Sequence, residues 1–80
     1  MYYVYILECS NGDLYTGFSG NLKKRFQEHK NGLNKSTKPF LHVRLVYYCA
    51  FQNEKIAIAF EKYLKSNSGR SFRNKHLIVK

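Results

Sequence analysis

Tryptophan is absent from this 80-residue sequence, proline occurs once, and there are only five glycines and two cysteines. So little proline and glycine excludes collagen-like and low-complexity classes. Cys9 and Cys49 are too few for a disulfide framework, so we expect reduced thiols. No apolar run approaches the ~20 residues of a membrane-spanning helix. The apolar start, Met1–Leu7, lacks the basic region of a signal peptide. We therefore expect a cytoplasmic protein with no membrane association.

Acidic residues are also scarce, since five Asp and Glu oppose 14 Lys and Arg and leave a net charge of +9. No Lys or Arg precedes Lys23, and no Asp or Glu follows Glu61. The basic residues therefore concentrate in two blocks, residues 23–44 and 62–80. Such blocks predict a basic face for a polyanion, most simply nucleic acid, although a surface tuned for solubility is the plain alternative. Aromatic residues make up 16% of the chain, which disfavours disorder.

The sequence pattern predicts alternating strands and helices in one domain, residues 1–80. We expect strands at 2–8, 13–18 and 44–51, helices at 22–31 and 54–67, a loop at 33–42 and a short final helix at 71–76. Asn21 and Asn53 are suited to cap the two main helices, and Gly69 to end the second. The order β-β-α-β-α-α predicts an α+β fold in which a small three-stranded antiparallel sheet is flanked by helices.

Asn11-Gly12 predicts the turn between the first two strands. A two-residue type I′ turn has positive φ at both positions, and it would place Glu8 opposite Tyr15. Tyr3 and Tyr5 share one face of the first strand, and Tyr15 lies on the partner strand. From strand propensity alone, the simplest interpretation is three tyrosines that pack a core face.

Two further groups are candidates for chemistry. Arg25 and His29 are four residues apart, so they share one helix face, which could be merely solvated. Glu61 borders the apolar stripe of the second predicted helix, where the plain alternative is an ion pair with Lys65. That stripe comprises Ile56, Phe60, Tyr63 and Leu64. Phosphate-binding loops and clustered zinc ligands are missing from the sequence.

The order of these residues resembles the GIY-YIG nuclease superfamily, in particular its small stand-alone bacterial members. It is similar to the N-terminal catalytic domain of the excision-repair endonuclease. The first motif appears as Tyr3-Val4-Tyr5 and the second as Tyr15-Thr16-Gly17, with nine residues between them. The segments 21–29, 45–48 and 59–62 match the family's first helix, its third strand and the helix that carries its metal-binding glutamate.

Some positions depart from that pattern. Tyr3 and Thr16 replace a glycine and an isoleucine of the two motifs. Phe18 stands where the excision-repair enzymes carry a lysine, so that cation must come from elsewhere or is not used. The family's later asparagine would correspond to Asn74 under one alignment that the sequence does not fix.

The resemblance implies a GIY-YIG endonuclease-like fold and a metal-dependent endonuclease that hydrolyses DNA, with DNA repair or recombination as its setting. Glu61 would hold Mg²⁺ or Mn²⁺, Arg25 would bind the scissile phosphate, and Tyr15 would take the proton from water, with Tyr5 hydrogen-bonded nearby. His29 would share the base role or orient the water. This choice stays open, because a free phenol with a pKa of about 10 is mostly protonated at neutral pH, whereas imidazole is not. We expect activity to rise with pH.

The basic blocks supply candidates for binding nucleic acid, DNA in preference to RNA. They are Lys24, Arg25, Lys35, Lys38, Arg70 and Arg73. We expect the two blocks to form one face beside the tyrosines, little sequence preference, and no small-molecule cofactor. Two alternatives remain: a binding module of the same fold with weak or no hydrolysis, and an accessory protein of RNA or ribosomes whose tyrosines stack on bases.

Overall fold

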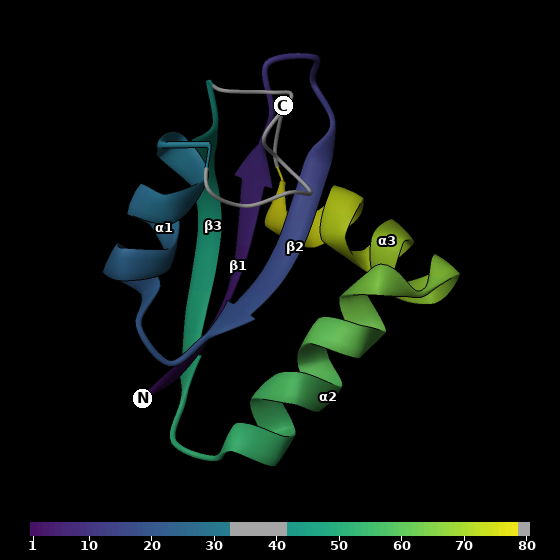
Figure 1. Cartoon of the computed structure of the whole chain (residues 1–80). Helices are drawn as coiled ribbons and strands as arrows, with labels where there is room; N and C mark the ends of the chain where they lie inside the picture. The colour runs from purple at the N-terminus through teal and green to yellow at the C-terminus, as the bar shows by residue number, and fades with distance from the viewer. Residues whose placement is uncertain (33–41, 79–80) are drawn as a thin grey trace.

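Strands and helices follow the predicted order. The computed structural model describes residues 1–32 and 42–78. Strands β1 (Tyr2–Glu8), β2 (Leu14–Ser19) and β3 (Arg44–Phe51) form an antiparallel sheet in the order β2-β1-β3 (Figure 1). Helix α1 (Leu22–Lys30) follows β2, α2 (Glu54–Lys65) follows β3, and α3 (Asn67–Phe72) continues into a short π-helical segment, η1 (Arg73–Leu77). The predicted α+β class and element order are confirmed.

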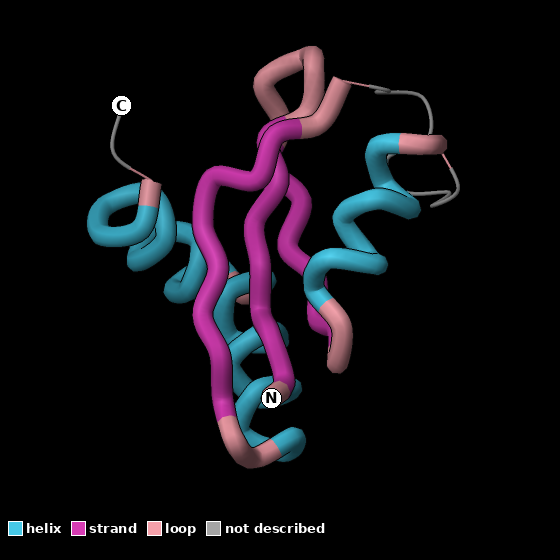
Figure 2. Tube along the Cα trace, turned by 90° about the vertical axis from the view of Figure 1, so that its left-hand side faces the viewer, coloured by secondary structure: helices cyan, strands magenta, loops and turns pink. Residues whose placement is uncertain are grey.

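Helices cover both faces of the sheet. On β1, Val4 and Ile6 pack against α2, whereas Tyr5 faces His29 of α1. Figure 2 accordingly shows α1 on one side of the strands and the other helices on the opposite side. Because both of its faces are covered, β1 has four consecutive buried residues, Val4 to Leu7. Within residues 1–32 and 42–78, none of the helices combines the length and apolarity needed to cross a membrane.

The turn after β1 differs from the predicted type I′ turn. Among the described residues other than glycine none has positive φ, so only Gly12, at φ 89°, adopts the left-handed region in this turn. Asn11 instead accepts a hydrogen bond from the backbone N–H of Asp13 at 3.0 Å. Gly12 N–H donates to the Cys9 carbonyl at 2.9 Å, and Cys9 N–H donates to the Asp13 carbonyl at 2.8 Å. The loop therefore has three residues, 10–12, a form in which glycine takes the left-handed position.

The longer loop changes the register of the hairpin. Leu14, not Tyr15, lies opposite Glu8, and Gly17 lies opposite Tyr5. A shift of one residue exchanges the two faces of a strand. Tyr15, two residues from Gly17, consequently shares the face of Tyr5 that is turned toward α1.

The helix caps follow prediction more closely than the helix ends. Asn21 and Asn53 each accept a hydrogen bond from a backbone N–H in the first turn of α1 and α2. Helix α2 ends two residues earlier than predicted, because Ser66 stops it and caps α3, its Oγ accepting from the Gly69 N–H at 3.1 Å. The expectation that Gly69 ends α2 is wrong, since Gly69 is buried inside α3.

The buried face of α2 is rotated relative to the predicted stripe. Ala57 and Leu64 are fully buried, and Phe60 packs against this core. Ile56 and Tyr63, which belong to the predicted stripe, are 56% and 42% exposed. Two of the four residues in the predicted stripe are therefore exposed to solvent instead of buried in the core.

Candidate active site

The hairpin and α1 bring Tyr5, Tyr15 and His29 together. The Tyr5 hydroxyl and the His29 Nε2 lie 3.0 Å apart, and these residues are 1% and 0% exposed. The Tyr15 ring centroid lies 5.1 Å from that of His29 and 6.5 Å from that of Tyr5. We call these three residues the tyrosine–histidine cluster. The possibility that His29 is only a solvated helical residue is wrong.

Gly17 makes room for the side chain of Tyr5. The two residues are direct partners across β1 and β2. A Cβ atom at position 17 would collide with the hydroxyl and ring of Tyr5. The phenol can therefore lie across β2 because position 17 has no side chain. In the sequence Gly17 stands out only as part of a motif. Its packing role becomes apparent only from the pairing of β1 with β2, which puts it opposite Tyr5.

Charges from both helical layers act on Tyr5. Burial raises the pKa of Tyr5 well above that of a free tyrosine, and the neighbouring Tyr15 raises it further. The Arg25 guanidinium opposes this rise, and the Glu61 carboxylate adds to it. Tyr5 is therefore protonated at neutral pH. Arg25 on α1 and Glu61 on α2 lie on opposite sides of the sheet, yet both are within electrostatic reach of the same phenol.

His29 is neutral in this setting. Burial lowers the pKa of His29, the Arg25 charge lowers it further, and Glu28 acts in the opposite direction. A neutral imidazole nitrogen can accept a hydrogen bond from the Tyr5 hydroxyl. The Tyr5–His29 contact is thus a buried bond between two uncharged groups, and Tyr15 packs beside it with part of its side chain exposed.

Arg25 and Glu61 each have an ion-pair partner on their own helix. Arg25 Nε lies 3.2 Å from a Glu28 oxygen, and 40% of the Arg25 side chain is exposed, less than expected for a solvated residue. Lys65 Nζ donates to Glu61 Oε2 at 3.3 Å, and the Glu61 side chain is 18% exposed. Helical pairs of this spacing contribute only about 0.3–0.5 kcal/mol, so a phosphate or a metal ion can replace these partners.

Glu61 offers a divalent cation one carboxylate rather than a closed cage. In the described part of the chain, no three His, Cys, Asp or Glu side chains are grouped to hold a metal. Mg²⁺ commonly binds proteins through one or two carboxylates and completes its coordination with waters and substrate phosphates. Glu61 fits that mode of binding, which Mn²⁺ shares as a hard cation.

A groove of about 620 Å³ opens beside Tyr15, between β2 and the C-terminal helices. Lys65, Arg70 and Arg73 line it, together with the carboxylate of Asp13. Burial is the main cause that lowers the pKa of Arg73, and the charge of the nearby Arg70 lowers it further. Arg73 nevertheless stays charged at neutral pH, because the pKa of a guanidinium group is very high. Two guanidinium groups held close together favour an anion between them. Arg70 and Arg73 are among the predicted nucleic-acid-binding residues, whereas the sequence indicates Lys65 only as an ion-pair partner.

Of the first basic block, the part on helix α1 lies on the side of the sheet opposite the C-terminal helices. Lys24 is exposed on α1, next to Arg25. Lys35 and Lys38 lie outside the described residues, as does most of the predicted loop at 33–42. Lys24 and the groove cations therefore come from helices on opposite sides of the sheet, and the single basic face that the sequence predicts stays a prediction.

Asn74 lies beside the groove. Its Oδ1 accepts a hydrogen bond from Arg73 Nε at 3.1 Å. Asn74 also lines an adjoining hollow of about 390 Å³ with Gly12 and Asp13. Its observed contact is therefore with an arginine of the groove.

The sequence matches the model of the GIY-YIG catalytic domain over residues 1–75. The chain belongs to the GIY-YIG family. This family forms a nuclease superfamily, so the general nuclease character implied by the sequence is supported. Most of the described chain, from β1 to η1, lies within the matched GIY-YIG region.

Relatives of this GIY-YIG chain include small proteins of similar length. A UPF0213 protein of Clostridium perfringens is 46% identical over 66 residues, which cover 81% of this chain and 71% of that protein. A UPF0213 protein of Streptococcus pyogenes is 40% identical over 70 residues, covering 86% and 76%. The solution NMR structure of a UPF0213 protein from Bacillus halodurans is similar with a TM-score of 0.60 and 35% identity, covering 94% and 82%. The resemblance to small stand-alone GIY-YIG proteins is confirmed.

Proposed function

We propose that this GIY-YIG chain is a divalent-metal-dependent endonuclease that hydrolyses DNA phosphodiester bonds, in the setting of DNA repair or recombination. One observation carries the proposal: Arg25 and Glu61, from opposite layers, both act on the phenol of Tyr5 within the tyrosine–histidine cluster. A cation suited to phosphate and a carboxylate suited to a metal therefore lie within electrostatic reach of one buried phenol. The basic groove begins at the second tyrosine of that cluster, Tyr15.

Each charged residue has a role in this proposal. Arg25 binds the scissile phosphate, because its planar guanidinium matches two phosphate oxygens. Glu61 is the residue that would hold Mg²⁺ or Mn²⁺. A metal bound there supplies Lewis acidity that stabilises charge on the phosphate and on the leaving oxygen. The cations proposed to hold neighbouring phosphates are Lys24, Lys35, Lys38, Arg70 and Arg73.

Tyr15 is the proposed general base, in preference to His29. Tyr15 is only partly buried and lines the groove, so it can meet a water molecule there. His29 is 0% exposed, and its Nε2 lies at hydrogen-bonding distance from the Tyr5 hydroxyl. His29 and Tyr5 then act as positioning residues against which the Tyr15 ring packs. Because a free phenol is mostly protonated at neutral pH, cleavage should become faster as the pH rises.

Comparing DNA cleavage by the wild type and by the Glu61→Gln variant tests the proposal. Supercoiled plasmid and a panel of single-stranded, duplex, flap and branched DNA are incubated with Mg²⁺, with Mn²⁺ or with EDTA. The wild type should cleave only with metal, and Glu61→Gln should reduce the rate about 10²-fold or more. Glu54→Gln, which changes an exposed carboxylate on the same helix, is the matched control and should cleave like the wild type.

A thermal melt with and without Mn²⁺ separates the enzyme from a binding module of the same fold. The ion pair with Lys65 is the observation that favours the module, because it gives Glu61 a structural partner. If Glu61 holds the metal, Mn²⁺ should raise the melting temperature of the wild type and of Glu54→Gln but not of Glu61→Gln. The same metal response in all three proteins, with DNA binding that EDTA does not change, would favour the binding module.

A further inference from the structure

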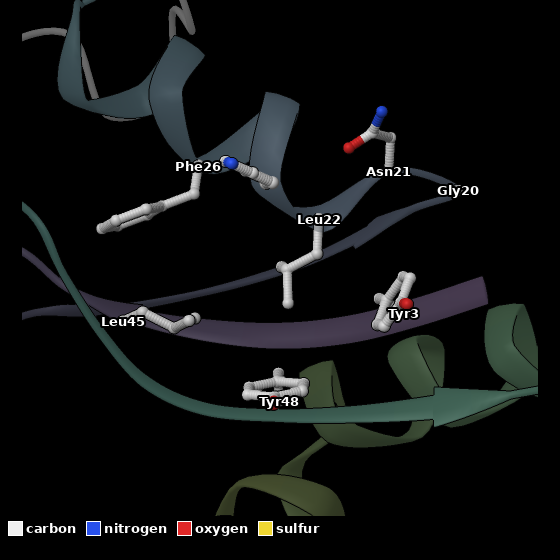
Figure 3. Close-up of a pocket in the computed structure, with 8 residues that line it drawn as sticks. Tyr3, Gly20, Asn21, Leu22, Phe26, Leu45 and Tyr48 are labelled. Atoms are coloured by element: carbon white, nitrogen blue, oxygen red, sulfur yellow. The ribbon is translucent and has the colours of Figure 1, made fainter. Parts of the chain in front are cut away.

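A second cavity, of about 480 Å³, lies between α1 and strands β1 and β3. Tyr3 of β1 and Tyr48 of β3 form one wall, Leu22 of α1 extends toward them from above, and Phe26 of α1 lies above Leu45 (Figure 3). The Tyr3 and Tyr48 ring centroids lie 6.4 Å apart with the rings tilted by 55°. We call this cavity the tyrosine pocket. Its lining is predominantly aromatic and apolar, which suits a flat organic group.

Tyr48 is unusually open for an aromatic residue in a strand. It is 56% exposed, although its partner across β1 is the fully buried Tyr5. Packing of the protein's own core therefore does not account for the position of the Tyr48 ring. An exposed tyrosine ring beside a cavity offers a π face on which a base can stack.

The charge of the pocket favours an anionic partner. Lys23 contributes to the lining, Lys24 follows it on α1, and no carboxylate lines the described part of the pocket. With a net charge of +9, two copies of this chain repel each other. A nucleotide meets both requirements, because its base is flat and its phosphate is negative.

The pocket also adjoins the proposed active site through the same elements. Tyr3 and Tyr5 lie on one face of β1, and Tyr48 is the direct partner of Tyr5. Helix α1 contributes Phe26 to the pocket and Arg25 to the charges that act on Tyr5. A group bound in the pocket therefore contacts the helix that carries the proposed phosphate-binding arginine.

We propose that the tyrosine pocket receives an unpaired base of the nucleic-acid substrate. This inference rests on the proposed function and specifies its substrate class: nucleic acid with unpaired nucleotides near the bond that is cut. A paired base is held in the duplex by stacking and pairing that must be given up before it can enter such a pocket. The chain should therefore bind single-stranded DNA more tightly than duplex DNA of the same sequence at equal salt.

Binding in EDTA tests the pocket independently of cleavage. The probe is a single strand that contains the fluorescent base 2-aminopurine, and its duplex with a complementary strand is the reference. Tyr48→Ala should weaken single-strand binding about 5- to 150-fold, the range expected for one lost stacking contact. It should leave duplex binding unchanged and remove the fluorescence quenching that stacking produces. Tyr48→Phe keeps the ring and should bind like the wild type.

Two more variants control for folding and position. Tyr63→Ala removes an exposed tyrosine of α2, on the opposite side of the sheet, and should leave single-strand binding unchanged. Lys23→Glu alters an exposed residue of the pocket without touching the core, and should weaken single-strand binding even if Tyr48→Ala does not fold. Far-UV circular dichroism of each variant verifies the fold.

Several outcomes would overturn the proposal. If Tyr48→Ala and Lys23→Glu both bind single-stranded DNA like the wild type, the pocket does not bind the substrate. The proposed nuclease function would be unaffected by that result, because its test is the metal-dependent cleavage that Glu61→Gln loses. An equal loss for single-stranded and duplex DNA would make Tyr48 a general contact rather than a base receptor. Self-association of the wild type that Tyr48→Ala abolishes would make a second copy the occupant. A wild type that binds no nucleic acid would overturn both proposals.

Discussion

The Tyr5 hydroxyl and the His29 Nε2 lie 3.0 Å apart in the interior between β1 and α1. Burial acts on the two groups in opposite directions, since it raises the pKa of Tyr5 and lowers the pKa of His29. Both changes favour the uncharged forms, so the pair is neutral at the pH where the enzyme would work. A protonated Tyr5 cannot serve as a base, which agrees with the proposal that its partly exposed neighbour Tyr15 takes that role.

Protonation of His29 should make stability depend on pH. The pKa of His29 is lowered from the value of about 6.5 for an unfolded chain. The unfolded state therefore binds the proton first as the pH falls. The stabilisation is complete above about pH 6.5 and declines below it, by up to ~1.4 kcal/mol per pH unit until the folded-state pKa is reached. Urea unfolding at several pH values between about 8 and 5 measures this decline.

His29→Gln and His76→Gln provide the comparison for that experiment. His29→Gln removes the titrating group, so its stability should change less between about pH 7 and pH 5.5, starting from a lower value. His76 is exposed, and His76→Gln should keep the wild-type pH dependence. If all three proteins lose stability in parallel, the decline belongs to other groups.

Gly17→Ala should destabilise the hairpin. The added Cβ would collide with the Tyr5 hydroxyl and ring, and relief of such overpacking costs about 1–3 kcal/mol. Cleavage should fall as well, because Tyr5 would be displaced from His29. Gly20→Ala is the control, since a Cβ there meets nothing within 4 Å. Chemical denaturation of both variants measures the difference, and equal stabilities would contradict the packing role of Gly17.

Arg25→Ala should abolish most cleavage while the fold persists. The loss of a phosphate-binding cation in a preorganised site costs about 10²-fold or more in rate. The side chain is 40% exposed and forms an ion pair with Glu28 on its own helix, and it also hydrogen-bonds to Tyr5. Loss of the helical pair should lower stability by about 0.5 kcal/mol or less, and loss of the Tyr5 contact by about 1 kcal/mol. Arg25→Lys should restore little activity, because an ammonium group cannot bind two phosphate oxygens side by side.

Lys24→Ala is the neighbouring control for Arg25→Ala. It removes an exposed cation from the same helical turn, so it should weaken binding slightly and leave the cleavage rate at saturating DNA unchanged. Single-turnover kinetics separate the two effects. An Arg25→Ala protein that cleaves at the wild-type rate would remove Arg25 from the mechanism.

Arg70 and Arg73 should govern the salt dependence of duplex binding. Each phosphate contact contributes about 0.9 to the slope of log affinity against log salt. The double variant Arg70→Ala, Arg73→Ala should therefore reduce the slope by about 2, measured by fluorescence anisotropy over a range of salt. Lys55→Ala, at the exposed start of α2, should leave it unchanged. A slope that the double variant does not alter would place the DNA elsewhere on the protein.

Local features of the sequence determined where strands and helices lie. The third predicted strand has the same bounds as β3, and Asn21 and Asn53 cap α1 and α2 as predicted. These features depend on residues within one turn of each other, so they can be read from the chain directly. The motif residues also indicated the GIY-YIG family, because the resemblance depends only on residue types, their order and their spacing along the chain.

Tertiary structure decided which of these residues meet. Asn11 bonds to Asp13 rather than adopting positive φ, and that choice sets the hairpin register that puts Tyr15 on the face of Tyr5. Packing of α1 on that face then buries His29, although the helical pattern alone was equally compatible with exposure. The charges of Arg25 and Glu61 act on the same phenol from opposite layers, because the sheet between those layers brings together helices far apart in the chain. These arrangements depend on contacts between segments that are distant in the sequence. The free energies of such contacts cannot be predicted from local sequence patterns.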